Sequence, residues 1–439
     1  MAKAADGVWT NWAGNQRCAP ARVAHPANEE ELARVVKEAA AIGGTVKAVG
    51  AGHSFTDIAT TSGTQVVLDR YRQVLAHDPD KRRVTVQAGI TLVQLNEELA
   101  KRGLAMANMG DIAYQSISGA ISTGTHGTGA EMGGIATQVV GLDLVTGDGS
   151  LLSCSATEHP DVFDAARVGL GALGLISTVT LQCVPAFHLR AIEEPMRLDH
   201  VLEHLDGYVA DNDFFEFFYV PHTGWALTKR NNRTDDPLAR RPRAKEWYQA
   251  YLIENVAFGA LCKVGKWRPS LVPKLAKALP SSGRNEYIDD SYRVFASPRL
   301  VHFYEMEYEI PREHVRDVLL AIRQWIDRSG MHVSFPIEVR FTAADDIPLS
   351  TAGGRISAYV AVHVYRGTQH EQYFRSVEAI MDEVAGRPHW GKLHYQKAST
   401  LAPRYPRWDE FQKIRARLDP EGRFANSYTD RVLGPLASP

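Results

Sequence analysis

The sequence has few cysteines, no long apolar run and no marked excess of either charge. Only 4 cysteines occur in 439 residues and none forms a CxxC pair, which argues against a zinc ribbon and a disulfide-stapled secreted fold. No stretch reaches the roughly 18 uninterrupted apolar residues of a membrane helix, and the first residues lack the apolar core of a signal peptide. The net charge of −2 comes without basic blocks, so composition gives no indication of nucleic-acid binding. We expect a cytoplasmic globular protein with no membrane span and no nucleic-acid partner.

Short strands and helices alternate along the first part of the chain. Asn28 followed by three glutamates predicts a helix start, with Asn28 as N-cap and Glu31 at the third helical position. Residues 45–49 indicate a strand that leads into glycines, and residues 91–101 indicate a second helix. Residues 139–152 are typical of a hairpin, because two apolar runs flank a Gly-Asp-Gly turn. This order predicts an α+β domain.

The composition changes after Phe187. The charged, proline-containing stretch 231–245 predicts a long surface loop. Residues 248–279 have mixed helical periodicity with four lysines, which favours ordinary helices of a second domain over a membrane-surface helix. Residues 357–365 alternate as a strand, with Tyr359, Ala361, His363 and Tyr365 on one face.

One motif is misleading. Residues 169–174 satisfy GxGxxG, but that fingerprint works only between a preceding strand and a following helix. Here a helix-like segment, 161–168, comes first and a strand-like segment, 176–184, follows. The glycines therefore favour close backbone packing, against a ligand or a strand, over a Rossmann site.

Two glycine-rich stretches, 49–55 and 116–129, are candidates for a ligand site. Both are rich in small and hydroxyl residues, which leaves backbone N–H groups available to an anionic ligand. The alternative from glycine content alone is a pair of tight turns with polar side chains.

Several motifs in order resemble one family. GxGHS occurs at residues 50–54, SxxGxxxTxxHG at 116–127 and GALGxIS at 171–177, and these resemble the FAD-binding domain of the vanillyl-alcohol-oxidase family. Residues 335–342 (FPIEVRFT), 386–392 (GRPHWGK) and 418–428 (LDPEGRFANSY) are similar to its aldonolactone oxidoreductase branch, the L-gulonolactone-oxidase-like branch, whose near relatives are alditol oxidases.

The resemblance implies an α+β, two-domain vanillyl-alcohol-oxidase-type fold. The FAD-binding domain would comprise residues 1–187 with a C-terminal return segment, 395–439. Residues 188–394 would form a cap or substrate domain built on an antiparallel sheet.

The resemblance also assigns cofactor-binding positions. It implies FAD, bonded through the imidazole of His53 to the flavin 8α-methyl group, with a histidine that only hydrogen-bonds as the alternative. The other positions implied to bind the cofactor are Gly50, Ala51, Gly52, Ser54, Gly110, Ser116, Gly119, Ser122, Thr123, Gly127, Gly174, Ile176 and Asn426. His126 is as readily structural as functional.

Glu338 and Arg340 are the strongest catalytic candidates. At i and i+2 of a strand they point to one face, although a surface ion pair would have the same spacing. The resemblance implies that they lie beside the reacting edge of the flavin, with Lys392, and that Ser116 and His363 face the substrate pocket. Arg340 suits the negative charge that develops on a substrate oxygen or on reduced flavin. The proton acceptor stays open.

The resemblance implies oxidation of a sugar-derived lactone at a secondary hydroxyl by hydride transfer to flavin N5, or of a polyol in the alditol alternative. O2 or another acceptor would reoxidise the flavin, and Gly110 would leave O2 a path because glycine lacks Cβ. A non-catalytic sugar- or flavin-binding protein is a rival from another class, against which Glu338, Arg340 and Lys392 argue. A histidine-metal hydrolase is suggested only by the 16 histidines. No HExxH motif supports it, so we predict no metal.

Overall fold

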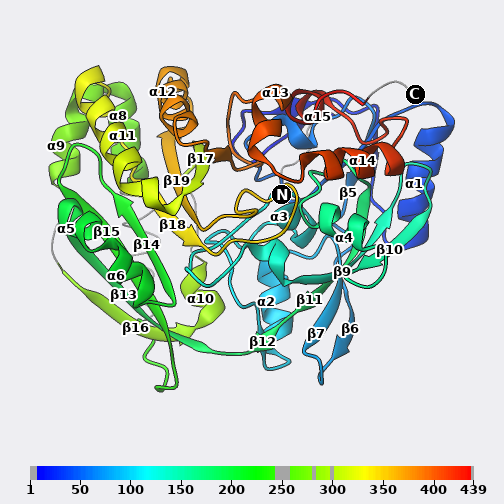
Figure 1. Cartoon of the computed structure of the whole chain (residues 1–439), viewed down its shortest axis with the longest axis horizontal. Coiled ribbons are helices and arrows are strands. Elements are labelled where there is room, and N and C mark those ends of the chain that lie inside the picture. Colours follow the sequence, from blue (N-terminus) through cyan, green and yellow to red (C-terminus); the bar gives the residue numbers. More distant parts are fainter. Residues whose placement is uncertain (1–6, 243–257, 279–282, 297–300, 437–439) are drawn as a thin grey trace.

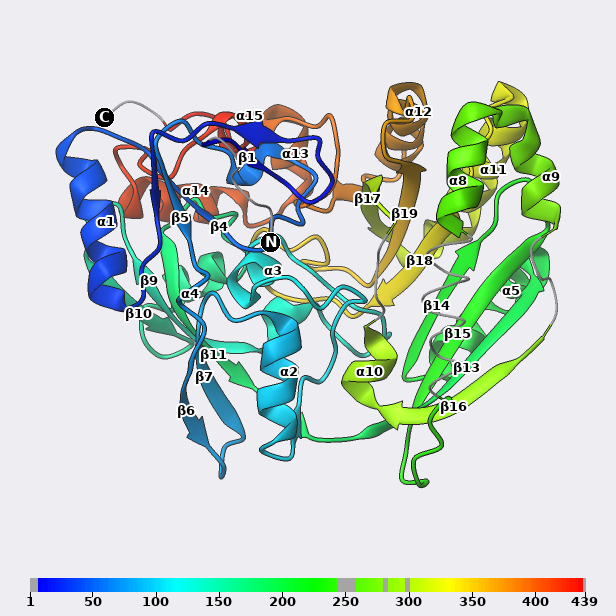
Figure 2. The same ribbon diagram turned by 180° about the vertical axis from the view of Figure 1, so that it is seen from behind.

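The computed structural model describes residues 7–242, 258–278, 283–296 and 301–436. It has two halves that lie side by side (Figures 1 and 2). One half carries the N-terminal strands, the four smaller sheets of the described residues and the C-terminal helices. The other is built on a single large sheet.

The first half opens with a helix packed on a small parallel sheet. Helix α1 (Glu29–Ala41) begins as the sequence predicts, because the Asn28 side chain accepts a hydrogen bond from the Glu31 N–H at 2.9 Å. Its apolar face shares a buried cluster with the sheet strands. In order across the sheet these strands are β3 (Arg22–Ala24), β5 (Thr64–Val67) and β4 (Val46–Val49). Strand β4 therefore leads directly into the glycine-rich loop that follows residue 49.

A five-stranded antiparallel sheet completes the β-structure of this half. Its order is β10 (Leu151–Ser155), β9 (Val139–Val145), β11 (Leu175–Gln182), β7 (Arg83–Gln87) and β6 (Val74–Asp78). Its helices are α2 (Leu92–Ala100), α3 (Ile117–Ser122) and α4 (Pro160–Arg167). The GxGxxG stretch lies between α4 and β11, so the predicted helix-then-strand order is confirmed.

Short elements connect these parts. They are β1 (Trp9–Thr10) paired with β2 (Arg17–Cys18), β8 (Leu104–Ala105) paired with β12 (Val184–Pro185), and the 3-10 turns η1 (Asp57–Ala59) and η2 (Ile135–Gln138).

The second half is an eight-stranded antiparallel sheet. Across it run β16 (Asn285–Asp290), β13 (His188–Arg197), β15 (Trp225–Thr234), β14 (Phe214–Tyr219), β18 (Ile337–Thr342), β19 (Ser357–Tyr365), β17 (Phe303–Pro311) and β20 (Arg387–Pro388). The predicted strand over 357–365 is therefore confirmed as β19.

The two faces of this sheet differ in polarity. Helices α5 (Leu198–Glu203), α6 (Leu205–Ala210), α11 (Val315–Ser329) and α12 (Glu371–Asp382) share a large apolar cluster with one face. In β17, Met306 and Tyr308 belong to this cluster, whereas Glu305, Glu307 and Glu309 alternate with them and point to the other face. The charged face of the sheet lies on the side of the first half.

The chain returns to the first half at its C-terminal end. Helices α13 (Ala398–Leu401), α14 (Trp408–Leu418) and α15 (Ser427–Leu433), with the turn η6 (Ala402–Arg404), lie against the N-terminal half in both views (Figures 1 and 2). Leu401, Phe411 and Val432 share one buried cluster with Ile117 and Ile121 of α3.

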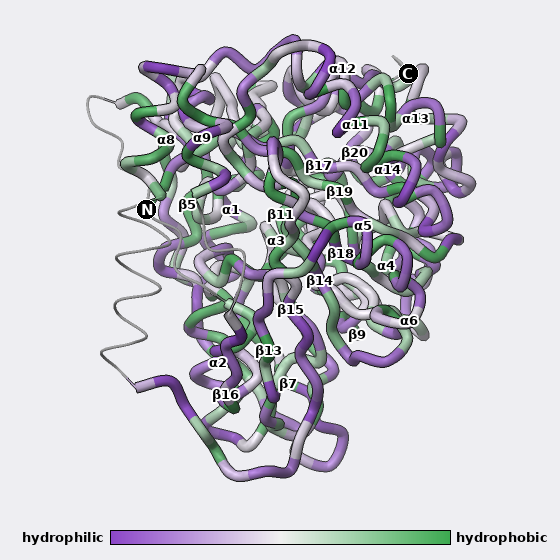
Figure 3. Tube along the Cα trace, turned by 90° about the vertical axis from the view of Figure 1, so that its left-hand side faces the viewer, coloured by the Kyte–Doolittle hydropathy of each residue, from purple (hydrophilic) through white to green (hydrophobic). Residues whose placement is uncertain are grey.

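The predicted loop over 231–245 is wrong at its start. Residues 231–234 continue β15, where each pairs with β13. Polar side chains are tolerated there because neighbouring strands satisfy the backbone, and Asn231 is itself buried. The following segment is hydrophilic, as Figure 3 shows toward the foot of the sheet, and residues 243–245 lie outside the described residues.

The predicted helical segment 248–279 is confirmed where it is described. It contains α8 (Phe258–Trp267), the turn η4 (Pro269–Leu271) and α9 (Val272–Lys277), while 248–257 and 279 lie outside the described residues. Helix α10 (Ser291–Phe295) and the turn η5 (Arg312–His314) complete the elements. Among the described residues, no helix is long and apolar enough to cross a membrane.

Candidate active site

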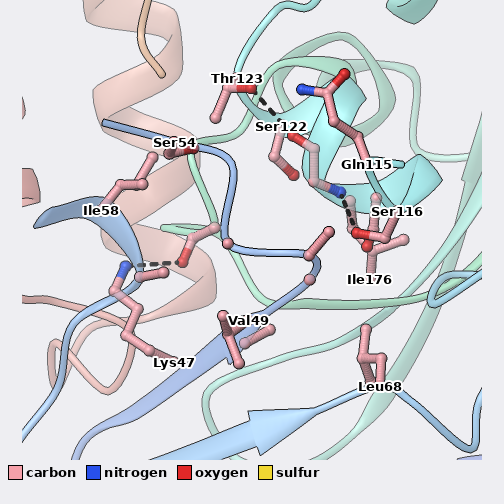
Figure 4. Close-up of a pocket in the computed structure, with 18 of the residues that line it drawn as sticks. Lys47, Val49, Ser54, Ile58, Leu68, Gln115, Ser116, Ser122, Thr123 and Ile176 are labelled. Atoms are coloured by element: carbon pink, nitrogen blue, oxygen red, sulfur yellow. Dashed lines mark hydrogen bonds between the residues drawn. The ribbon is translucent and has the colours of Figure 1, made fainter. Parts of the chain in front are cut away.

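A cleft opens in the first half where the two glycine-rich stretches meet (Figure 4). The empty space in it is about 920 Å³, open solvent at its mouth included. The sequence-predicted residues that line it are Gly50, Ala51, Gly52, His53, Ser54, Ser116, Gly119, Ser122, Thr123, Gly174 and Ile176. The structure thus brings residues from β4, α3 and β11 to one cavity.

Close packing of the two stretches explains the glycines. A Cβ on Gly50 would lie 2.1 Å from Ser116 Oγ, and Gly52 has a φ of +72°. Both positions therefore disfavour a side chain. The bare backbone of the loop and the N-terminal end of α3 border the same cleft, an arrangement suited to the diphosphate of a dinucleotide cofactor.

Lys47 was not predicted from the sequence, although it lines the same cleft (Figure 4). Its Nζ donates a hydrogen bond to the Gly171 carbonyl at 3.3 Å. Burial, reinforced by Arg415, lowers the pKa of Lys47 to about 7. Because the cleft-lining residues include no Asp or Glu, the charge lining of the cleft fits an anionic ligand such as FAD.

Three predicted cofactor residues lie outside the cleft lining. Gly110 packs against the His126 carbonyl, where a Cβ would be 2.9 Å from the oxygen, and Gly127 packs against Asn108. Asn426 caps α15, and its amide also donates to three carbonyls of the 57–60 turn. Asn426 therefore fixes the turn whose residues Ile58 and Ala59 border the cleft.

His53 lies at the junction between the cleft and the large sheet. The loop after it is hydrogen-bonded to the 389–392 segment, since the Phe55 N–H donates to Gly391 O at 2.7 Å. Burial and the nearby Lys392 ammonium lower the pKa of His53 to about 4. Its imidazole is therefore neutral at ordinary pH, and the Trp12 ring lies 5.5 Å from it.

Arg340 is the centre of a buried ionic cluster on the charged face of the sheet. Its Nε donates to Glu216 Oε2 at 2.9 Å and its Nη2 is 3.3 Å from Asp111 Oδ1. It also forms a close ion pair with Glu338 Oε1. Although burial opposes it, these carboxylates raise the pKa of Arg340, so the guanidinium stays charged.

The Glu338 carboxyl group has a raised pKa. Burial raises the pKa of Glu338 to about 7. The Arg340 guanidinium opposes this shift, whereas the negative charges of Asp111 and Glu216 add to it. Its contact with Arg340 lacks hydrogen-bond geometry, and within the described part of the chain Glu338 Oε1 receives no hydrogen bond. This carboxylate can therefore exchange a proton near neutral pH.

Lys392 belongs to a second ionic group beside the first. It is paired with Glu305, and its Nζ lies 4.0 Å from Glu307 Oε2. His363 Nε2 is 3.4 Å from Glu305 Oε1, and His126 Nε2 is 3.2 Å from Glu307 Oε1. The structure thus brings Lys392 and His363 to the same glutamate and places His126 against the neighbouring one.

The one candidate metal cluster found among the described residues is His126, Glu307 and His389, whose ligand atoms lie within 4.8 Å of one another. It holds the ion pair already described, and the Lys392 ammonium is 4.0 Å from Glu307. Such a cation beside the carboxylate disfavours a metal ion.

Sequence reasoning missed Asp111, Glu216, Glu305, Glu307 and His389. One signal was present, because Glu-Met-Glu-Tyr-Glu at 305–309 alternates charged and apolar residues as a half-buried strand does. Asp111 and Glu216 carry no local pattern, and only the tertiary fold brings them to Arg340.

A dinucleotide cleft flanked by a charged antiparallel sheet defines a class of FAD-dependent oxidoreductases with the vanillyl-alcohol-oxidase-type fold. A solvent-stable cholesterol oxidase shares this fold with a TM-score of 0.83 at 19% identity, over 97% of each chain. The chain belongs to the D-arabinono-1,4-lactone oxidase family, whose model matches residues 179–432. A FAD-binding-domain model matches residues 20–155, so FAD is the cofactor.

Named relatives are similar along their whole length. L-gulono-1,4-lactone dehydrogenase of Mycobacterium tuberculosis strain H37Rv is 46% identical, over 98% of this chain and 99% of the relative. L-gulonolactone oxidase of Bos taurus is 36% identical, over 96% and 97%. D-arabinono-1,4-lactone oxidase of Yarrowia lipolytica is 29% identical, over 87% and 85%.

Proposed function

We propose that this enzyme oxidises an aldonolactone of the L-gulono-1,4-lactone type at its C2 hydroxyl group, giving a 2-keto lactone that tautomerises to ascorbate or an analogue. The observation that carries the proposal is the gathering of Glu338, Arg340 and Lys392 on the sheet face that adjoins the His53 loop. The names of the relatives support the lactone over a polyol.

We also propose the division of labour between the two halves. Residues 1–187 and 395–439 would hold FAD, and 188–394 would cover its reacting end. In support, every strand of the large sheet lies between His188 and Pro388. The proposed cofactor contacts are the cleft-lining residues, with Gly110, Gly127 and Asn426 shaping the segments around them.

His53 is the proposed point of covalent attachment to FAD. A nucleophilic imidazole needs a free lone pair, and the lowered pKa of His53 keeps it neutral. The nearby Lys392 ammonium would also favour the negative charge that a flavin ring gains when it is attacked or reduced.

The chain's own residues orient the substrate and handle its proton. The cofactor, when bound, supplies the electron-pair acceptor for the C2 hydride. Arg340 and Lys392 bind the substrate oxygens on which negative charge develops. The Glu338 carboxylate, whose pKa burial raises to about 7, accepts a hydrogen bond from the reacting hydroxyl and takes up its proton. Ser116 and His363 are the proposed neighbours of the substrate.

We propose O2 as one acceptor of the electrons, with hydrogen peroxide as product. The relatives named above include both a dehydrogenase and an oxidase, and Gly110 supports the oxidase reading because it lacks a Cβ in the segment beside Asp111 and the Arg340 cluster.

The test is a spectrum followed by a substrate screen. The purified protein should be yellow, and its flavin should remain with the acid-precipitated pellet, from which His53→Ala should release it. Anaerobic L-gulono-1,4-lactone should bleach the flavin. Bleaching by polyols but not by lactones would replace the substrate class, and no bleaching by any would leave a binding protein.

A further inference from the structure

Five side chains form a line on the face of the large sheet, and four of them are buried while Lys392 is partly exposed. Lys392 is at its centre, between Glu305 and Glu307 of β17. His363 of β19 contacts the far oxygen of Glu305, and His126 contacts the far oxygen of Glu307. The line joins the two halves, because His126 comes from the segment after α3.

Each end histidine is held by two contacts. The Nδ1 atom of His126 lies 2.9 Å from Gly127 O, and that of His363 lies 3.2 Å from Pro336 O. The Nε2 atom of each histidine faces a glutamate oxygen.

The carboxylates keep the central ammonium charged. Burial alone would lower the pKa of Lys392, but Glu305 and Glu307 raise it above its ordinary value. Conversely, Lys392 and His363 lower the pKa of Glu305 despite its burial, and His126 does the same for Glu307.

The two glutamates also set the direction of the ammonium. They stand at i and i+2 of one strand, so their Cα atoms are roughly 7 Å apart and their side chains are parallel. An ammonium has three N–H donors. Glu305 accepts one of them and Glu307 lies on the other side, which leaves at least one donor for a ligand.

We propose that Glu305 and Glu307 are positioning residues that hold the Lys392 ammonium in place for a substrate oxygen, with His126 and His363 as the outer contacts that fix the glutamates. The inference rests on the proposed function, because it gives Lys392 a substrate to bind. Neither glutamate touches the reacting atoms in this scheme. Each acts through Lys392.

The test is a double-mutant cycle read by anaerobic flavin reduction with L-gulono-1,4-lactone. Glu305→Gln should slow the limiting reduction rate about tenfold in the parent, the size of a close charge coupling. In a Lys392→Met background the same change should alter the rate less than about twofold, because a positioning residue has nothing left to position. Glu307→Gln provides a second cycle if Glu305→Gln folds poorly.

Glu309→Gln is the matched control. Glu309 lies on the same face of the same strand but pairs with Arg355, so its variant should change the thermal midpoint without moving the reduction rate or its pH profile.

Two readouts separate positioning from loss of structure. Glu305→Gln should move the alkaline limb of the reduction rate to lower pH, and Glu305→Asp should partly restore it. The titratable groups that face Lys392 are Glu305, Glu307, Asp111 and the neutral imidazoles of His53 and His389, and only the first is changed. Glu305→Gln should also weaken equilibrium binding of the 2-deoxy lactone, which cannot be oxidised at C2, by severalfold.

The outcomes are distinguishable. A slow Lys392→Met enzyme in which Glu305→Gln and Glu307→Gln still lower the rate by their full factors would overturn the positioning role and leave the proposed function intact. Lys392→Met at the parent rate would overturn both the positioning role and the assignment of Lys392 to the site. Failure of the lactone to reduce the parent flavin at all would instead reject the proposed function, while binding of the 2-deoxy lactone would still report on the glutamates.

Discussion

Three side chains in or near the cofactor cleft have pKa values that burial displaces far from their ordinary values. Burial lowers the pKa of His53 to about 4 and that of Lys47 to about 7, and it raises that of Glu338 to about 7. The direction follows from which form is charged, because burial disfavours the ion. Each group consequently makes a prediction with a definite sign.

Flavin reduction by the lactone should become faster as the pH rises through about 7. Glu338 must be ionised to take the hydroxyl proton, and its pKa is about 7. Glu338→Gln should remove this limb and slow reduction by about 10²–10³. Stopped-flow reduction between pH 5 and 9 is the measurement, and a parent rate independent of pH would show that another group accepts the proton.

Lys47→Met should stabilise the cofactor-free protein near neutral pH and weaken its affinity for FAD. The folded-state pKa of about 7 lies below the ordinary lysine value of 10.5, so the unfolded chain binds more protons between these two pH values. The contribution of Lys47 to the free energy of unfolding is therefore complete above pH 10.5 and is lost as the pH falls through about 7. The difference in stability between Lys47→Met and the parent should therefore become smaller toward pH 10.

Urea unfolding of this variant in a His53→Ala background, which allows the cofactor to be removed, provides the measurement. FAD titration of the same protein gives the second readout. Equal FAD affinity of Lys47→Met and its parent would exclude a role for the ammonium in holding the cofactor.

At the scale of elements, the caps of two helices make a matched comparison. Asn28 caps α1, away from the cleft. Asn426 caps α15 and also fixes the 57–60 turn, which borders the cleft. Either asparagine-to-alanine change should cost about 1 kcal/mol of stability through the lost cap. Only Asn426→Ala should also weaken FAD binding, measured by fluorescence titration in the His53→Ala background. Equal losses of FAD affinity would mean that the effect is general destabilisation.

The segment around Gly110 makes a prediction about oxygen. Gly110→Ala should slow reoxidation of the reduced enzyme in air-saturated buffer while leaving reduction by the lactone nearly unchanged. The new Cβ would lie 2.9 Å from the His126 carbonyl oxygen, so one backbone must move and the path is expected to narrow. The measurement is the stopped-flow rate of reoxidation of the reduced parent and of reduced Gly110→Ala. Identical reoxidation rates would remove Gly110 as a gate, and negligible reoxidation of the parent would identify a dehydrogenase.

Elements with local signals were predictable from the sequence. The Asn28 cap, the 139–155 hairpin and the alternation of β19 each depend on residues within a few positions of one another. The partners of Arg340 could not be predicted in this way, because both lie more than 100 residues away in the sequence. Glu216 approaches through the pairing of β14 with β18, and Asp111 comes from a loop of the first half. The β15 extension was missed since its polar residues are paired across the sheet.

At the scale of the whole molecule, the response of thermal stability to added FAD tests the proposed bond between FAD and His53. If FAD is bonded to His53, adding free FAD cannot raise the thermal midpoint of the parent. His53→Ala should bind FAD reversibly, so its thermal midpoint should rise with FAD concentration. At a hundredfold excess of FAD over Kd, binding should stabilise the folded protein by about 2.7 kcal/mol. Differential scanning fluorimetry across FAD concentrations tests this. A parent midpoint that follows FAD concentration would exclude a permanent bond.

The return of the C-terminal helices has a consequence for how the chain folds during synthesis. Ile117 and Ile121 share their buried cluster with Leu401, Phe411 and Val432, so nearly 300 residues separate these partners. Contacts so distant in sequence form late, because the loop between them must close first. Part of the apolar core of the N-terminal half therefore stays exposed to solvent until helices α13 to α15 have been synthesised. During this interval the nascent chain is most exposed to aggregation and to chaperones.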